Sequence, residues 1–289
     1  MHQIPVTCPV CGGHQDKEFL QILRRAEDGS GGSYRVAQCR DCGFLFVNPR
    51  PTPAELLALY ASHVAYFREE YEPLSLESPV LAGVLRDIQA FVSGGSLLEV
   101  GCGRGELLEL ARKSGFQVYG CDLQRAPSLD PGISVHLGDL SSSSFLAHSF
   151  DCVVIRNTLE HLFDPGQELK TCARLLKPGG FLYLKVPNGD YEHGWRCRLM
   201  LGQANAFGPP WHLNYFTETT LHMLLRKNGF EIADWVIESP TPDSRPFRNL
   251  FQGTAVAAFR ALRLLTLGRA FPKPLLTSIS RKIPVPADG

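Results

Sequence analysis

The stretch Leu97-Leu98-Glu99-Val100-Gly101-Cys102-Gly103-Arg104-Gly105 decides the fold of this 289-residue chain. An apolar run is followed directly by three glycines at every second position, and a helical pattern begins one residue later. Strand, glycine-rich turn and helix in this order bring a ligand against bare backbone at the start of a helix. The stretch therefore predicts an α/β sheet with a ligand site at one edge.

From this stretch to residue 238, short apolar runs alternate with helical patterns. Such alternation is typical of βαβ units in a doubly wound, mostly parallel sheet. We expect strands at Leu97–Val100, Gln117–Cys121, Ile133–His136, Cys152–Ile155, Phe181–Val186 and Glu231–Ile237, and a seventh at Leu275–Lys282. We expect helices at Glu106–Ser114, Gln167–Leu176 and Glu218–Asn228.

The spacing of the glycines and the residue before them restrict the class of ligand that the loop can bind. A dinucleotide-binding loop has the pattern G-x-G-x-x-G, but here Glu106 takes the place of the third glycine. Glu99 lies just before the loop, where its carboxylate would repel a pyrophosphate and attract a ligand with an ammonium and a sulfonium. The alternative for Glu99 is a solvated strand end.

Two aspartates follow the next two predicted strands. Asp122 ends the second strand, a position that suits a carboxylate accepting hydrogen bonds from ribose hydroxyls. Asp139 follows the third strand and could accept a hydrogen bond from an adenine amino group. Either residue alone is more often a loop or helix-cap residue, but both are in register with the glycine loop.

Residues 97–238 resemble the class I, Rossmann-like S-adenosylmethionine-dependent methyltransferases. The matching motifs are LLEVGCGRGELLEL, YGCDL, GDL, FDCVVIRNTLEHLFDP, LLKPGGFLYLKVPN and HLNYFTETTLHMLLRKNGF. The last two are most similar to the group that includes ubiquinone-type O-methyltransferases and sugar methyltransferases. The resemblance implies S-adenosylmethionine as the cofactor, bound by Glu99, Gly101, Gly103, Asp122, Asp139, Leu140 and Asn157.

Two C-x-x-C-G motifs lie near the N-terminus, at residues 8–12 and 39–43. Four thiolates with no open position make a closed, tetrahedral structural zinc site, so we predict Zn²⁺ held by Cys8, Cys11, Cys39 and Cys42. Reduced, unpaired cysteines and a redox dithiol are the alternatives. The absence of a signal peptide favours a cytoplasmic, reducing location in which disulfides are rare.

The chain divides into three parts by composition. We expect a zinc-ribbon module over residues 1–52, a helical linker or cofactor lid over 53–92, and the methyltransferase domain over 93–289. The first part resembles zinc-binding modules that precede methyltransferase domains in sugar C-methyltransferases. Those enzymes carry a further large C-terminal domain that has no counterpart in these residues, so their C-methylation chemistry is not carried over.

Candidate residues for the chemistry follow the fourth and fifth strands. His161 and His212 are each predicted as a general base or a substrate contact, with helix capping as the alternative for His161. Trp211 and Tyr215 could form an aromatic wall at the substrate, or could simply pack. Tyr60 and Tyr66, in the linker, could close over the cofactor.

Charge and hydropathy restrict the partners. The formal net charge is zero, which disfavours binding to nucleic acid, and no apolar run is long enough to cross a membrane. A basic helical insertion at about 241–270 could contact a membrane surface peripherally, or could cover the substrate pocket. The oligomeric state is not predicted.

The leading hypothesis is therefore methyl transfer from S-adenosylmethionine to a small-molecule acceptor, such as a metabolite or a sugar-type substrate, at oxygen. Alternatives are methylation of a lipid-linked or polysaccharide intermediate, or of RNA. An alternative of another class is a cofactor-sensing scaffold protein without turnover.

Overall fold

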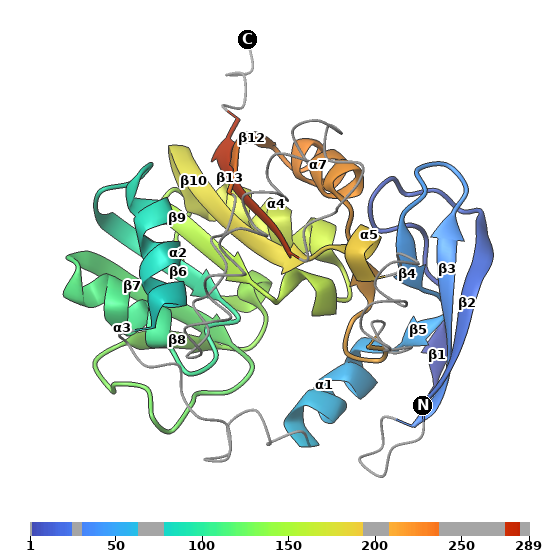
Figure 1. The fold of residues 1–289 in the computed structure, drawn as a ribbon. Helices are drawn as coiled ribbons and strands as arrows, with labels where there is room; N and C mark the ends of the chain where they lie inside the picture. The colour runs from blue at the N-terminus through green and yellow to red at the C-terminus, as the bar shows by residue number, and fades with distance from the viewer. Residues whose placement is uncertain (1, 25–30, 63–77, 193–207, 237–274, 284–289) are drawn as a thin grey trace, which may run out of the picture.

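The structure is a computed structural model that describes residues 2–24, 31–62, 78–192, 208–236 and 275–283 (Figure 1). Tyr66 and the predicted basic insertion at about 241–270 lie outside these ranges. Within the ranges, no helix has the length and apolar character needed to cross a membrane.

A seven-stranded sheet forms the centre of the molecule. Its strands are β6 (Gly95–Val100), β7 (Phe116–Asp122), β8 (Ser134–Leu137), β9 (Phe150–Arg156), β10 (Leu176–Pro187), β12 (Phe230–Trp235) and β13 (Leu275–Lys282). The strand order is β12-β13-β10-β9-β6-β7-β8, and β13 runs opposite to the other six strands. The predicted mostly parallel α/β sheet is confirmed, and the seventh strand has the predicted bounds.

Helices cover both faces of this sheet (Figure 1). Along β9, Cys152 and Val154 pack in one cluster with α2 (Pro79–Gln89) and α3 (Glu106–Lys113). Val153 and Ile155 pack in the other cluster, with α4 (Pro165–Leu175) and α7 (Glu218–Lys227). Because both faces are buried, the strand is continuously apolar rather than alternating.

Two short 3₁₀ helices lie at the edge of the sheet where the parallel strands end. They are η2 (Leu140–Ser142), after β8, and η3 (Leu159–His161), after β9. The helix α4 follows η3 and begins at Pro165, where the side chain of Asp164 accepts a hydrogen bond from the Gln167 amide at 2.9 Å. This start is two residues earlier than predicted, since proline is favourable at the first helical position.

A second, smaller sheet is built mainly from the N-terminal residues. It contains β2 (Asp16–Arg24), β3 (Gly32–Cys39), β4 (Leu45–Val47) and β11 (Asn214–Tyr215), in the order β11-β4-β3-β2. The short strands β1 (Gln3–Ile4) and β5 (Arg50–Pro51) pair beside it, and α1 (Pro53–Ser62) and α5 (Gly189–Glu192) complete the described helices. Because β11 comes from residues 214–215, the small sheet takes one strand from the part of the chain that carries the large sheet.

Candidate active site

The glycine loop is closely packed against the loop that follows β9. Gly101 has a φ of +70°, and a Cβ atom at this position would lie 2.2 Å from the Thr158 Oγ1 atom. Gly103 has a φ of +54°, and its amide donates to Asp122 Oδ2 at 2.8 Å. Glycine is required here for both conformation and space, so the loop presents backbone at the start of α3 as predicted.

Glu99 is buried, with 1% of its surface exposed, so a solvated strand end is wrong. Its Oε1 atom accepts hydrogen bonds from Nε and Nη2 of Arg156, at 3.0 and 2.9 Å. Its Oε2 atom is buried and has no hydrogen-bond partner among the described residues. Burial raises the pKa of Glu99 despite the adjacent guanidinium. A buried acceptor without a donor is costly, which suits a site where a cationic ligand group completes the pair.

The other predicted cofactor residues lie at the carboxyl ends of neighbouring parallel strands, and therefore at one edge of the sheet. Asp122 is the last residue of β7, and burial raises its pKa although backbone amides donate to it. Asp139 is exposed and precedes η2 without making a side-chain cap bond, while Leu140 behind it is buried. Asn157 is exposed at the end of β9 with a φ of +49°. The structure thus brings these residues to the edge that also carries the glycine loop.

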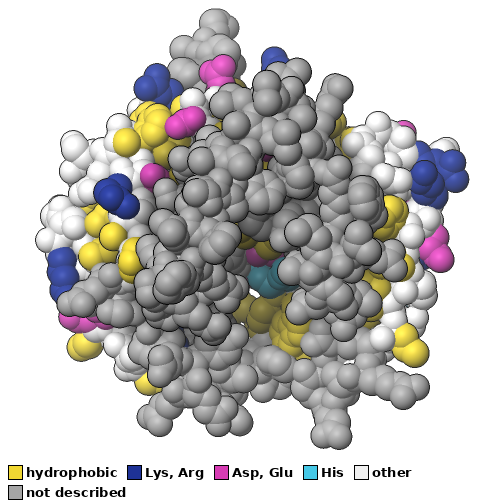
Figure 2. Space-filling model, in the orientation of Figure 1, with side chains coloured by type: hydrophobic (Ala, Val, Ile, Leu, Met, Phe, Trp, Pro, Cys, Tyr) yellow, Lys and Arg dark blue, Asp and Glu magenta, His cyan; other side chains and the backbone are white. Residues whose placement is uncertain are grey.

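His161 and His212 are brought together from distant parts of the chain. Their ring centroids lie 4.8 Å apart with an interplanar angle of 70°. The Nδ1 atom of His161 lies 2.8 Å from the carbonyl oxygen of Trp211. A carbonyl only accepts, so Nδ1 carries the proton and Nε2 is left to accept one. Histidine surface is visible near the centre of one face in the space-filling view (Figure 2).

Both histidines are in the uncharged state at neutral pH. Burial lowers the pKa of His161, and it lowers that of His212 to about 4, with the neighbouring His161 ring acting in the same direction. An uncharged imidazole can take a proton from a hydroxyl group. Together with Glu160, whose Oε1 lies 3.7 Å from His161 Nε2, the two rings are also close enough to share a metal ion.

Aromatic residues surround the histidine pair. The Tyr60 ring, on α1, contacts His161 and Trp211 edge-on, with centroid distances of 6.2 and 5.1 Å. Its hydroxyl is buried and makes no hydrogen bond to any described residue. Tyr215 is 1% exposed and donates to the carbonyl oxygen of His212 at 3.0 Å. The structure therefore supports packing for Tyr215 rather than a substrate wall, and brings Tyr60 and Trp211 to the histidines.

The four N-terminal cysteines converge as a zinc site requires. Their sulfur atoms lie within 4.8 Å of one another, and the pairs Cys8–Cys42 and Cys11–Cys39 are each separated by 3.6 Å. A tetrahedron with Zn–S bonds of 2.3 Å gives sulfur–sulfur distances of about 3.8 Å, so the residues fit the ion. Gly12 and Gly43 have positive φ values of 85° and 75°, which explains the glycine that ends each motif.

A family model described as "Methyltransferase domain" matches residues 75–234, which is more than half of the chain. The chain belongs to this methyltransferase family. The match extends from α2 to β12 in the large sheet. It excludes residues 1–52, which contain the four N-terminal cysteines and are here called the cysteine module. The predicted resemblance is confirmed.

Curated relatives of this methyltransferase include enzymes named ubiquinone biosynthesis O-methyltransferase. The protein from Saccharophagus degradans is 36% identical over 129 residues, which cover 41% of this chain and 54% of the relative. The protein from Burkholderia orbicola is 34% identical over 133 residues, covering 43% and 57%. The chain thus spans about half the length of the curated relatives it matches.

Solved structures show the same fold. An S-adenosylmethionine-dependent methyltransferase from Mesorhizobium loti superposes with a TM-score of 0.51 at 21% identity, over 72% of this chain and all of that one. The 1,6-didemethyltoxoflavin-N1-methyltransferase of Burkholderia thailandensis, solved with S-adenosylhomocysteine, gives 0.55 at 17% identity, over 91% and 99%. The class I methyltransferase fold is therefore confirmed.

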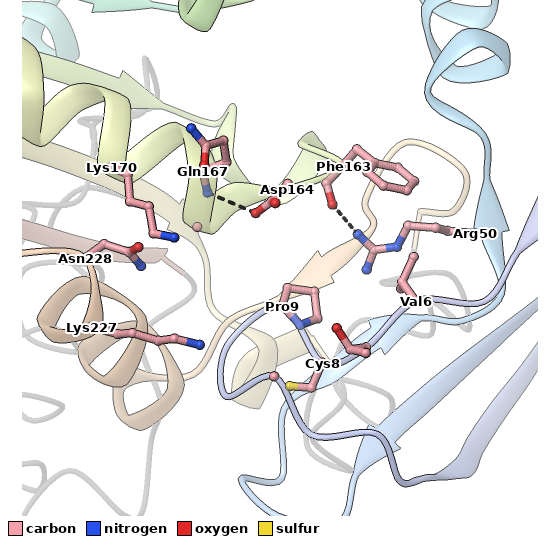
Figure 3. Close-up of a pocket in the computed structure, with 13 residues that line it drawn as sticks. Val6, Cys8, Pro9, Arg50, Phe163, Asp164, Gln167, Lys170, Lys227 and Asn228 are labelled. Carbon is pink, nitrogen blue, oxygen red and sulfur yellow. Dashed lines mark hydrogen bonds between the residues drawn. The ribbon is translucent and has the colours of Figure 1, made fainter.

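Two residues at or near the candidate site of this methyltransferase were not predicted from the sequence. Arg156, the partner of Glu99, could have been suspected as a charged residue ending an apolar strand. Arg50 lies beside a cavity of about 400 Å³ between the cysteine module and α4, where Lys170 and Lys227 also point inward (Figure 3). No sequence pattern distinguishes Arg50 from other loop arginines.

Proposed function

We propose that this protein transfers the methyl group of S-adenosylmethionine to the oxygen of a small-molecule acceptor. The observation that carries the proposal is the uncharged His161–His212 pair, in which His161 follows β9, the strand whose following loop packs on the glycine loop. Thr158 links the two parts, because it lies three residues before His161 and its side chain packs on Gly101. Its hydroxyl oxygen lies 3.1 Å from the Arg156 carbonyl oxygen and 3.4 Å from that of Val100. A proton acceptor would therefore lie close to the methyl donor.

The residues at the sheet edge fit the cofactor in chemical type. Glu99 Oε2 suits the ammonium of the amino-acid part, Asp122 suits the ribose hydroxyls, and Asp139 with Leu140 suits the adenine. Gly101 and Gly103 allow close approach of the backbone, and Asn157 directly precedes Thr158, which packs on Gly101. When bound, S-adenosylmethionine supplies an electrophilic methyl group with a good leaving group.

The chain's own contribution is alignment and proton removal. The acceptor hydroxyl must be held in line with the methyl group, and its proton must leave as the new bond forms. His161 Nε2 would take this proton, while its Nδ1–H bond to Trp211 O fixes the ring. His212 would hold the acceptor oxygen or the developing charge. The names of the curated relatives support oxygen as the methylated atom.

We also propose that Zn²⁺ is bound by Cys8, Cys11, Cys39 and Cys42 in a structural role. The site has four sulfur ligands and no open position, so the ion would not take part in the reaction. Its contribution would be to hold together the two motifs, of which the first precedes β2 and the second connects β3 to β4.

Calorimetry with S-adenosylmethionine and a transfer assay on a panel of hydroxylated small molecules would test the proposed function. We expect binding by the zinc-loaded protein and release of S-adenosylhomocysteine with at least one acceptor. His161→Ala and His212→Ala should spare cofactor binding and reduce turnover. Absence of cofactor binding would overturn the proposal, and binding with unchanged turnover in both variants would overturn the histidine roles.

A further inference from the structure

Arg50 is an arginine with no exposed surface at the boundary between the cysteine module and the methyltransferase domain. Its Nε donates to Val47 O at 3.2 Å, within the module. Its Nη1 donates to Phe163 O at 2.7 Å (Figure 3). Its Nη2 donates to Asn214 Oδ1 at 3.4 Å. The guanidinium also faces the Phe163 ring at 5.5 Å. One side chain thus joins three separate segments.

Burying this charge is unfavourable by itself. The hydrogen bonds of Arg50 go to two carbonyls and an amide, none to a carboxylate, and burial lowers its pKa to about 10. It is still charged at neutral pH. Hydrophobic packing is often at least as stabilising as a buried charge, so a buried arginine in this position indicates a geometric role. A planar fork of donors fixes the relative positions of its acceptors, which a lysine does not.

Asn214, one of the acceptors of Arg50, is hydrogen-bonded to the residues on either side of His161 and lies two residues after His212. Asn214 donates through Nδ2 to Leu162 O at 2.7 Å and to Glu160 O at 3.4 Å, the two residues that flank His161. The Leu213 amide donates to the same Glu160 oxygen at 2.9 Å, and Leu213 follows His212. The loop that carries His161 is therefore bound to the loop that carries His212 through the residue that Arg50 contacts.

The small sheet also contacts the loop that carries His212. Val47 N donates to Leu213 O at 2.9 Å, and Asn214 pairs with Phe46 across β11 and β4. Arg50 closes this arrangement, because it binds Val47 O, on the module side, and Phe163 O, two residues after His161. The cysteine module therefore contacts the histidine loops at a defined point.

We propose that Arg50 is a positioning residue for methyl transfer, which sets the relative placement of the His161 and His212 rings by binding Phe163 O and Asn214 Oδ1. This inference rests on the proposed function of the two histidines. It makes the cysteine module part of the active-site framework. Neither reacting group is touched by Arg50, so its effect is exerted through the two loops.

The test uses the full-length, zinc-loaded protein with S-adenosylhomocysteine and needs no acceptor. Histidine ring ¹⁵N NMR would follow the titration of His161 and His212 in Arg50→Met, Arg50→Lys and Asn214→Ala. Glu160 and Tyr60 face His161, and the histidines face each other, so any change in ring placement alters their protonation. We expect the pKa of His212 to rise from about 4 toward the ordinary 6.5, and that of His161 to rise as well, in all three variants.

Arg35→Met is the matched control. Arg35 is also an arginine of the module, but its Nη1 donates to Asn48 O at 2.9 Å and its Nη2 pairs with Asp16 at 2.5 Å, both within the module. We expect this variant to lose stability without moving the histidine pKa values. Affinity for S-adenosylhomocysteine should remain within about twofold in all variants, because the glycine loop is not contacted.

The outcomes separate this inference from the proposed function. Unchanged histidine titration in folded Arg50→Lys and Asn214→Ala would overturn the role of Arg50, even if methyl transfer is observed. Equal changes in Arg35→Met would also overturn it, since any module damage would then suffice. Lack of cofactor binding by the unaltered protein would instead overturn the proposed function. The titration would still show whether Arg50 affects the placement of the histidine rings. If Arg50→Met does not fold, the other two variants decide.

Discussion

The side chain of Thr158 occupies the space that a Cβ atom on Gly101 would need, 2.2 Å from its hydroxyl oxygen. Thr158 lies three residues before His161, and Gly101 lies in the glycine loop. The two residues therefore join the proposed cofactor site to the proposed proton acceptor. Changes at either residue should affect both properties.

Gly101→Ala should weaken S-adenosylmethionine binding by about tenfold or more, because it combines a strained positive φ with a clash against Thr158. Calorimetry would measure the effect. Gly179→Ala is the control, since Gly179 has a φ of +75° and nothing within 4 Å of its added Cβ. Equal effects of the two substitutions on cofactor affinity would contradict the proposed contact.

Asp122→Ala should reduce cofactor affinity by about tenfold to a hundredfold, because it removes a charged acceptor that also holds the Gly103 amide. Asp122→Asn keeps an acceptor oxygen and should lose less. The control is Asp130→Asn, which breaks an exposed ion pair with Arg112 and removes no hydrogen bond to the Gly103 amide. Unaltered calorimetric affinity in Asp122→Ala would exclude this residue from the site.

The stability contributed by His161 and His212 should fall as the pH is lowered from about 6.5 toward 4. Glu168 acts in the opposite direction, because burial raises its pKa to about 7, so the histidine contribution is measured as the difference between the unaltered protein and His212→Asn. The folded-state pKa values of His161 and His212 are lowered, so below pH 6.5 the unfolded chain binds more protons than the folded one. Their contribution is present above pH 6.5 and is lost on acidification, by on the order of 1–3 kcal/mol. Urea unfolding at several pH values would show it. His212→Asn should flatten the slope, whereas His222→Gln, at an exposed position on α7, should leave it unchanged.

The protein should carry one zinc ion per chain, and Cys42→Ser should reduce both zinc content and the free energy of unfolding. Metal analysis and thermal unfolding would measure these effects, with Cys152→Ala, in the large sheet, as a variant that keeps its zinc. Prolonged chelation should perturb the histidine titration as well, because β4 pairs with β11 next to His212. Full stability after complete loss of zinc would exclude a structural role.

The large sheet could be predicted from the sequence because its strands are buried on both faces and so form continuous apolar runs. The bounds of β13 were predicted even though it runs antiparallel. The grouping of Glu99, Asp122 and Asp139 followed from the rule that parallel strands end at one edge. The environment of Glu99 did not, because its partner Arg156 lies on another strand and only the fold brings the two charges together.

The histidine pair illustrates the other limit of sequence analysis. His161 and His212 could each be singled out, but their contact depends on β11, a strand of two residues. Two residues carry no periodicity, so neither β11 nor its pairing with β4 could be predicted. Arg50 was missed for the same reason, since its role arises from acceptors more than a hundred residues away along the chain.

The pairing of β11 with β4 has a consequence for protein engineering. A cysteine module that shares a sheet with the chain after His212 cannot be exchanged between methyltransferases as an independent cassette. A chimera cut at residue 52 would keep β3 beside β4 but would separate β4 from β11, which contains Asn214 and Tyr215. Functional recombination should therefore require residues 1–52 and the segment around 208–217 to be transplanted together.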